Sequence, residues 1–282
     1  MRKIIVPVDF SGDSLKAFHK AVYMAKKLSA EIHLLHVKKT RSFASIFSSQ
    51  KEEKDVNIEQ SFQEMLSSVK PDGVNVIQIT KSGSSVSKEI VKYADSQEAY
   101  LIIMGTHGVS GFEEFWMGSN AYRVVSSADC PVLSMRGADN FIEISKIVLP
   151  IDLSATTRQK VPFTLDLAKH FNAEVHVIGT CIDETDEFVM KLTSYTGQVA
   201  RFLTEKGIKV ATDFIKGDNV TTMTIDYAKK IDADLIAIMT DQETSMLNAF
   251  LGAYAQQMVN HSPIPVVSMH KNTNLEGNIS IM

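Results

Sequence analysis

The chain has 282 residues, of which 44% are hydrophobic, and its formal net charge at neutral pH is -4. Such a chain is long enough for two packed domains and too apolar to be disordered. Its isoelectric point near 6.1 and its lack of a concentrated basic run exclude an electrostatic basis for nucleic-acid binding.

The longest apolar runs, such as LIIM and DLIAIM, have the length of strands and are far short of the roughly 20 residues that a membrane span needs. We therefore expect no transmembrane helix and no membrane partner. The N-terminal MRKIIVPVDF reaches Asp9 after a short apolar run and offers no small-residue cleavage site, which favours a cytoplasmic protein. Cys130 and Cys181 stand in different halves without a CxxC pattern, so we interpret them as neutral thiols.

An internal repeat organises the chain. KIIVPVDFS (3–11) aligns with KIVLPIDLS (146–154) at an offset of 143, whereas CPVLSM aligns with IPVVSM at an offset of 134. The first copy therefore carries nine extra residues, between Val37 and Gly83. They fall in KKTRSFASIFSSQKEEKD, a polar stretch that predicts a loop or a short lid.

Within each copy, short and almost continuously apolar runs alternate with helical patterns. In the first copy we expect strands at 3–8, 31–37, 74–79, 100–105 and 131–135, with helices at about 12–29, 56–69, 84–97 and 119–127. In the second copy we expect strands at 145–151, 174–180, 208–214, 234–239 and 265–269.

Strands of this kind are typical of a parallel sheet covered by helices on both faces. Right-handed crossovers then favour two tandem α/β domains, each a doubly wound sheet with a switch point near its first strand. Ligands bind such sheets beyond the carboxyl ends of the strands, so the segments after the first and fourth strands are the candidate sites.

Glycines mark the segment after the fourth strand of the first copy. Gly105, Gly108 and Gly118 are followed by Ser119, where a helix is expected to begin. Glycine lets a phosphate approach backbone N–H groups, and the helix N-terminus attracts an anion. The alternative is ordinary turn chemistry. The second copy places Met239, Gln242 and Ala253 opposite Gly105, Gly108 and Ser119, and keeps a glycine, Gly252, opposite Gly118.

Asp9 follows the first strand and precedes Ser11. An aspartate at this point either orients a ribose or a divalent cation on a phosphate, or caps the turn into the next helix.

These residues carry a family resemblance. MGTHGVSGFEEFWMGS followed by CPVLSM, with IIVPVDFS at the start, closely resembles the universal stress protein family, and the first copy matches the G-x2-G-x9-G-S pattern of its ATP-binding branch. The resemblance covers essentially the whole chain as a tandem protein. It implies Rossmann-like domains at 1–138 and 144–271 with a tail at 272–282, each domain being a five-stranded parallel sheet of order 3-2-1-4-5 that is flanked by helices.

The resemblance also implies a site for ATP, ADP or AMP in the first domain, with Asp9 as a candidate ligand for Mg²⁺. The implied nucleotide-binding residues are Pro7, Val8, Asp9, Val37, Met104, Gly105, His107, Gly108, Gly118, Ser119 and Asn120.

The second copy lacks most of the motif and resembles the non-nucleotide branch of the family. We expect it to pair with the first domain as an intramolecular pseudo-dimer, to which a further homodimer contact is a possible addition. The alternative is that it binds something else through TDQETSMLNAF, whose Met246, Leu247 and Phe250 are either core residues or an exposed patch.

Catalysis is not expected beyond weak ATP hydrolysis, because no acid, base and nucleophile converge in the sequence. His107 is interpreted as the only histidine at the site, and His33 and His176 as core histidines. Three hypotheses remain: a nucleotide-binding regulator of a stress response that acts on an unknown protein partner, an interaction protein with a relic site, and an enzyme that consumes ATP on a small molecule.

Overall fold

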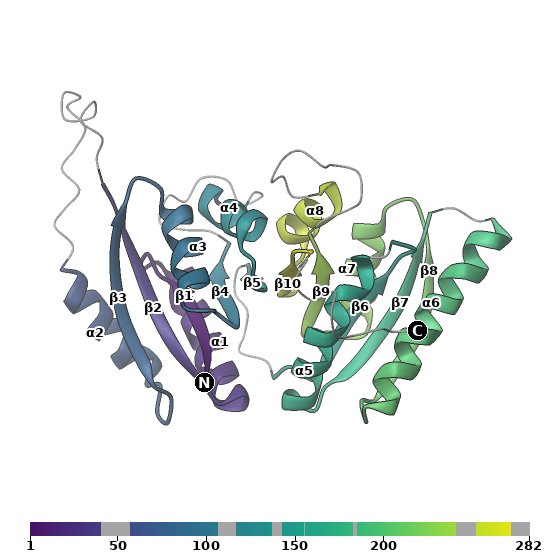
Figure 1. The fold of residues 1–282 in the computed structure, drawn as a ribbon, viewed down its shortest axis with the longest axis horizontal. Helices are drawn as coiled ribbons and strands as arrows, with labels where there is room; N and C mark the ends of the chain where they lie inside the picture. Colours follow the sequence, from purple (N-terminus) through teal and green to yellow (C-terminus); the bar gives the residue numbers. More distant parts are fainter. Residues whose placement is uncertain are drawn as a thin grey trace. The chain divides into compact units, whose positions relative to one another are not determined.

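The computed structural model describes residues 1–40, 57–106, 117–136, 143–154, 156–182, 185–240 and 252–271. The chain divides into two compact units, Met1–Met135 and Arg136–Met282, each of which is described by itself (Figure 1). Among the helices of these ranges, none is both long and apolar enough to cross a membrane.

The first unit is a parallel sheet of order β3-β2-β1-β4-β5. Helices α1 and α2 contact each other, as do α3 and α4, so the sheet carries a pair of helices on each face. The elements are β1 (Arg2–Pro7), α1 (Gly12–Leu28), β2 (Ala30–Lys39), α2 (Ile58–Val69), β3 (Val76–Gly83), α3 (Val86–Ser96), β4 (Leu101–Gly105), α4 (Ser119–Ser127) and β5 (Val132–Met135).

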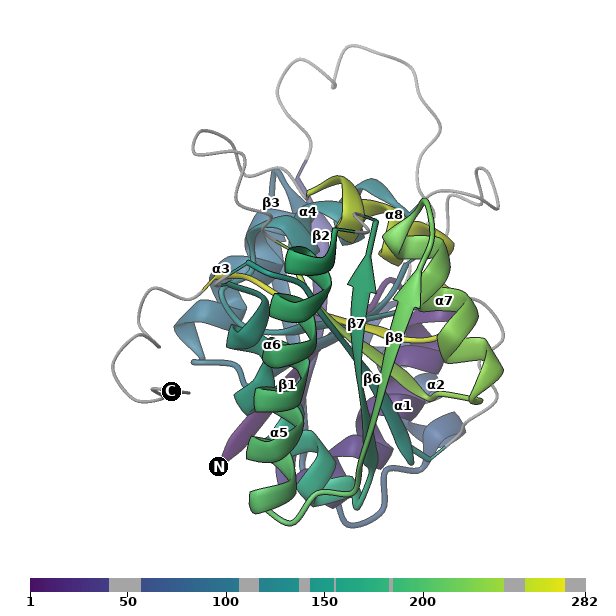
Figure 2. The same ribbon diagram turned by 90° about the vertical axis from the view of Figure 1, so that its right-hand side faces the viewer.

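The second unit repeats this topology in the order β8-β7-β6-β9-β10. Figure 2 shows α5 and α6 on one side of β6, β7 and β8, with α7 on the other side. The elements are β6 (Lys146–Ile151), the 3-10 helix η2 (Thr156–Lys160), α5 (Val161–Phe171), β7 (Glu174–Cys181), α6 (Asp186–Glu205), β8 (Val210–Lys216), α7 (Val220–Lys230), β9 (Leu235–Met239), α8 (Ala253–His261) and β10 (Val266–Met269). The predicted fold class is confirmed.

Central strands are buried because helices cover both faces, as their unbroken apolar runs predicted. Ile4, Ile5 and Val6 of β1 have no exposed surface, and Val148 and Leu149 of β6 have none. The predicted loop or lid at 38–55 begins within β2, which runs to Lys39, and from residue 41 on it lies outside the described residues. So does most of the segment after β9, with Met246, Leu247 and Phe250.

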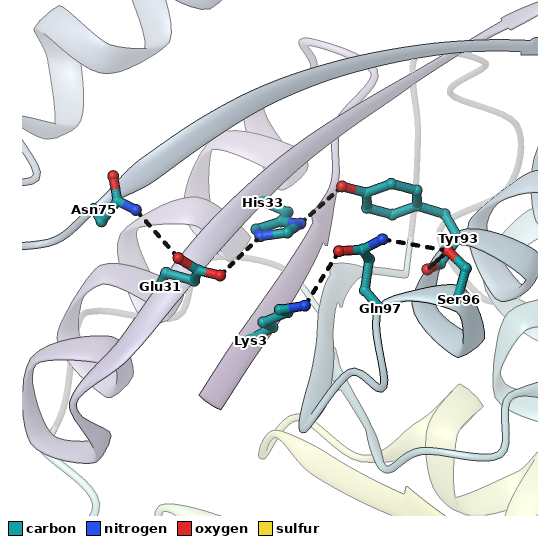
Figure 3. A network of polar contacts seen from close by, with 7 residues as sticks. All are labelled: Lys3, Glu31, His33, Asn75, Tyr93, Ser96 and Gln97. Atoms are coloured by element: carbon teal, nitrogen blue, oxygen red, sulfur yellow. Dashed lines mark hydrogen bonds and ion pairs between the residues drawn. The ribbon is translucent and has the colours of Figure 1, made fainter. Parts of the chain in front are cut away.

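His33 lies in the core of the first unit, in a polar network drawn in Figure 3. Its Nδ1 shares a hydrogen bond of 2.8 Å with the hydroxyl of Tyr93, and its Nε2 lies 3.3 Å from Glu31 Oε1. Glu31 also accepts a hydrogen bond of 3.2 Å from Asn75. Both ring nitrogens therefore have partners, which confirms the interpretation of His33 as a satisfied core histidine.

His176 occupies the corresponding place in the second unit, but its network is less complete. Its Nδ1 lies 3.0 Å from the hydroxyl of Tyr227, whereas its buried Nε2 has no hydrogen-bond partner among the described residues and lies 3.7 Å from Glu174 Oε1. Lys209, at the position of Asn75, forms an ion pair of 2.8 Å with Glu174. Burial lowers the pKa of His176, so the neutral imidazole is the favoured form.

The two cysteines are not paired with each other. Cys181 is buried at the end of β7, and burial raises the pKa of the partly exposed Cys130 to about 12, with Asp95 contributing. Cys130 is thus a neutral thiol at physiological pH, as predicted.

Candidate functional site

A cavity of about 340 Å³ lies in the first unit, where β1, β2 and β4 end and α4 begins. This is the switch point of the sheet, where β1 pairs with both β2 and β4. The lining residues are Pro7, Val8, Asp9, Ser14, Leu35, His36, Val37, Val86, Ile90, Met104, Gly105, Thr106, Gly118, Ser119, Asn120 and Ala121.

Every predicted site residue that the structure describes lines this cavity. His107 and Gly108 lie outside the described residues. The residues that the structure brings together are Pro7, Val8, Asp9, Val37, Met104, Gly105, Gly118, Ser119 and Asn120.

The interpretation of His107 as the only histidine at the site is wrong, because His36 lines the cavity. His36 Nδ1 lies 2.9 Å from the carbonyl oxygen of Val8, and its ring stacks on Phe10 at 4.7 Å between centroids. Phe10 in turn meets Phe62 of α2 edge-on at 5.3 Å. These contacts hold the imidazole ring beside β1, where it forms a flat and partly apolar side of the cavity. The sequence feature that could have predicted this role is the position of His36 directly before Val37, a predicted site residue.

Helix α4 begins at the edge of the cavity. Its N-cap is Gly118, so no side chain caps its first turn, and Ser119 is the first helical residue rather than the cap. The N–H groups of an uncapped first turn, together with the helix dipole, favour an anion at this point. Ser119, Asn120 and Ala121 of this turn all line the cavity.

Gly118 also forms a backbone contact between the start of α4 and the end of β4, which we call the joint. Its N–H donates a hydrogen bond of 2.7 Å to the carbonyl oxygen of Thr106, whose own N–H donates to Met135. The second unit repeats the joint, since Gly252 N–H donates to the carbonyl oxygen of Thr240 at 3.1 Å. A Cβ on Gly118 would lie 3.2 Å from the Thr106 oxygen. This close approach accounts for the glycine in the first unit, and Gly252 has nearly the same backbone conformation in the second.

Gly105 has a packing reason of its own. A Cβ on Gly105 would lie 2.9 Å from the Cβ of Asp13 and 3.1 Å from its carbonyl group, because the first turn of α1 packs on the end of β4. In the second unit Met239 stands opposite Gly105, and the 3-10 helix η2 packs on β9 where α1 would begin. The loss of this glycine accompanies the changed helix start.

Asp9 is exposed at the end of β1 and takes part in a local turn. Its Oδ1 accepts hydrogen bonds from the N–H (3.1 Å) and hydroxyl (2.5 Å) of Ser11, which caps α1 by accepting from Ser14 N–H. In the second unit Asp152 accepts from Ser154 N–H (2.8 Å) and hydroxyl (2.6 Å) in the same way. The aspartate therefore has a structural role in both copies, whatever it binds.

Metal binding would depend on that same aspartate. Within the described part of the chain, no group of three or more His, Cys, Asp and Glu residues is arranged to hold a metal ion. Asp9 is the one carboxylate among the residues that line the cavity. A single carboxylate fits Mg²⁺ that is carried on phosphate oxygens and water, rather than a cage made of protein ligands.

The second unit has a smaller cavity of about 240 Å³ at the corresponding place. Tyr254 stands there at the position of Asn120, and Lys160 contributes a buried amine. The lining residues are Pro150, Ile151, Asp152, Lys160, Thr180, Ile182, Phe188, Val220 and Tyr254.

Comparison with known proteins points to one family. The model of the universal stress protein family matches residues 1–136 and again residues 143–270. A universal stress protein of Methanocaldococcus jannaschii is 34% identical over 140 residues, which are 48% of this chain and 82% of that protein. The universal stress protein YxiE of Bacillus subtilis is 29% identical over 154 residues, 48% of this chain and 98% of YxiE.

Solved structures share the fold over nearly the whole chain. The crystal structure of a universal stress protein from Archaeoglobus fulgidus superposes with a TM-score of 0.75 at 18% identity and covers 96% of this chain and 98% of that one. A functionally unknown protein from Pseudomonas aeruginosa superposes with a TM-score of 0.68 at 19% identity, over 96% and 92% of the two chains.

Proposed function

The chain belongs to the universal stress protein family, and from this premise we propose that its first domain binds one adenine nucleotide in the cavity between β1, β4 and α4. The observation that carries the proposal is the uncapped first turn of α4, which opens on a cavity lined by the described residues of the family's nucleotide motif, Gly105, Gly118 and Ser119. Bound nucleotide acts here as a regulatory ligand in a cytoplasmic stress response.

The residues suit the parts of a nucleotide. The backbone of Ser119 and Asn120 offers N–H groups to phosphate, and the Ser119 hydroxyl adds a donor. Val37, which is 8% exposed, and the ring of His36 provide the apolar and flat surfaces that a base requires. Asp9 lies within the same lining, toward the ribose.

Magnesium, when it is present, would neutralise phosphate charge beside Asp9. The proposal assigns no catalytic residue in the first cavity and at most slow ATP hydrolysis.

The second domain is proposed to be a partner of the first rather than a second nucleotide site. Its cavity is smaller, and Tyr254 and Met239 replace Asn120 and Gly105. We place the domains at 1–138 and 144–271, with a tail at 272–282, and propose that they pair as an intramolecular pseudo-dimer, which a second chain can extend.

One observation favours a second candidate, an interaction protein with a relic site. Gly105 and Gly118 both have packing reasons that need no ligand, since a Cβ on either would crowd Asp13 or Thr106. In that case the first cavity would bind no nucleotide, and the glycines would persist for packing alone.

A matched pair of variants tests the proposal. Gly118→Val places a branched side chain where phosphate would approach the N–H groups, and we expect ATP affinity to fall about tenfold or more, equivalent to about 1.4 kcal/mol or more. Gly252→Val makes the same change at the corresponding position of the second domain, where φ and ψ are -56° and 148° against -57° and 144° for Gly118. Calorimetric titration with ATP should therefore show no change in Gly252→Val.

Equal loss of affinity in both variants would mean that the joint matters only for folding. Unchanged affinity in folded Gly118→Val would place the phosphates elsewhere. Far-UV circular dichroism of each variant shows whether the domain is intact.

A further inference from the structure

A lysine is buried in the cavity of the second domain. Lys160, the last residue of η2, is 3% exposed and lines that cavity. Its Nζ donates a hydrogen bond of 3.0 Å to Thr157 Oγ1, which leaves two of its three N–H groups without a partner in the described part of the chain. A buried ammonium with one neutral partner is costly, and an added negative charge would offset that cost.

Asp152 offsets the positive charge of Lys160 only in part. It lies close enough to favour the protonated amine, but the two groups are not within ion-pair distance among the described residues. Its Oδ1 already accepts two hydrogen bonds from Ser154. Burial lowers the pKa of Lys160 to about 8, so at pH 7 the amine is still mostly protonated.

Tyr254 supplies a second unused polar group. Its hydroxyl is buried, lies near Thr224 and makes no hydrogen bond of good geometry in the described structure. Buried tyrosine hydroxyls normally have a partner. Lys160 and Tyr254, which line one cavity, are therefore both able to donate to a ligand.

Most of the remaining lining is apolar, and the space is small. Pro150, Ile151, Phe188 and Val220 line the cavity, and Ile182 beside them is 60% exposed. The volume of about 240 Å³ lies below the roughly 300–1,000 Å³ of typical sites for drug-sized ligands. The cavity therefore suits a compact apolar body with one charged end rather than a nucleotide.

The lining residues that differ from those of the first domain suit an anionic ligand. Lys160 stands at the repeat position of Ala17, which has no exposed surface and does not line the first cavity. Thr180 replaces Val37, which puts a hydroxyl where the first cavity has an apolar side chain. Both domains keep an uncapped helix start, at α4 and at α8, and the second adds a buried amine to the lining of its cavity.

We propose that the second domain binds a small organic monoanion, a carboxylate with an apolar body, in the cavity lined by Lys160 and Tyr254. The carboxylate accepts hydrogen bonds from Lys160 Nζ and the Tyr254 hydroxyl, and the body packs against Phe188 and Val220. A single negative charge suits the site, because Asp152 would repel a second one.

Two pairs of small probes test the proposal on the full chain by saturation-transfer NMR at pH 7. Benzoate and butyrate carry the charge, whereas benzamide and butyramide have nearly the same shape without it. We expect saturation transfer to the two carboxylates and little to the amides. Equal transfer to the amides, or no transfer to either carboxylate, would overturn the proposal.

Variants identify the residue responsible. Lys160→Met keeps most of the side-chain volume and removes the charge, and we expect benzoate affinity to fall about tenfold or more. Lys229→Met, a change at an exposed lysine of the same domain, should leave affinity unchanged. If folded Lys160→Met retains benzoate affinity, the site is not the one proposed.

The wild-type protein provides a test without substitution. Benzoate affinity should fall as the pH rises through about 8, because Lys160 loses its proton. The other titratable groups of the lining are Asp152 and Tyr254. Burial raises the pKa of Tyr254, so its hydroxyl keeps its proton in this range, and the benzoate probe is ionised throughout it. An affinity that stays constant from pH 7 to pH 9.5 would contradict the assignment to Lys160.

Discussion

At the scale of single residues, the glycines after β4 serve packing as well as any ligand. Gly105 allows the first turn of α1 to approach β4, and Gly118 allows a short hydrogen bond to Thr106. The second copy keeps a glycine, Gly252, opposite Gly118, where the hydrogen bond is also kept. It has Met239 opposite Gly105, where the start of the neighbouring helix has changed. A glycine in a nucleotide motif is thus evidence of close approach, and the group that approaches has to be identified separately.

We predict that Gly105→Ala destabilises the first domain by about 1–3 kcal/mol, the usual cost of overpacking, because its Cβ would lie 2.9 Å from the Cβ of Asp13. Gly12→Ala is the matched control, since a Cβ there meets nothing within 4 Å. Urea unfolding followed by circular dichroism measures both variants. Equal stability of Gly105→Ala and Gly12→Ala would contradict the packing explanation.

At the scale of elements, the repeat preserves helix positions while it changes how the helices are capped. Helix α7 begins after Asn219, whose Oδ1 accepts a hydrogen bond of 3.0 Å from Thr222 N–H. Helix α3 begins after Ser85 at the same repeat position, but Ser85 makes no capping hydrogen bond. The two domains therefore do not depend equally on this residue.

We predict that Asn219→Ala lowers the free energy of unfolding by about 1 kcal/mol, the typical value of a side-chain cap. Ser85→Ala should cost clearly less, because no capping bond is lost. Urea denaturation of both variants tests the difference. A loss in Ser85→Ala as large as in Asn219→Ala would show that the cap geometry does not govern stability here.

The elements were predictable because their signals are local. The apolar runs placed β1 and β6 within one residue of their observed bounds, and α4 where it begins. The roles of His36 and Lys160 were not predictable in this way. His36 lines the cavity because β2 continues to Lys39 and brings three consecutive residues, Leu35 to Val37, to the site. Lys160 is buried by the packing of η2 on β9, and no local pattern reveals that contact.

At the scale of the whole molecule, one fold occurs twice in the chain and its two cavities have diverged. Both have an uncapped helix start, at α4 and at α8, and the first has the glycine motif and a cavity of about 340 Å³. The second has a buried lysine, a tyrosine and a cavity of about 240 Å³. Duplication of the domain thus kept the sheet and its switch point while it changed the groups that a ligand would meet.

Calorimetric titration of the full chain with ATP, with and without Mg²⁺, tests the central claim most directly. We predict about one nucleotide per chain, bound by the first domain, because its cavity alone combines the glycine motif with the uncapped start of α4. Binding of two nucleotides per chain would contradict the assignment of the second cavity to another ligand. A titration without binding, with either ATP or AMP, would contradict the nucleotide site itself.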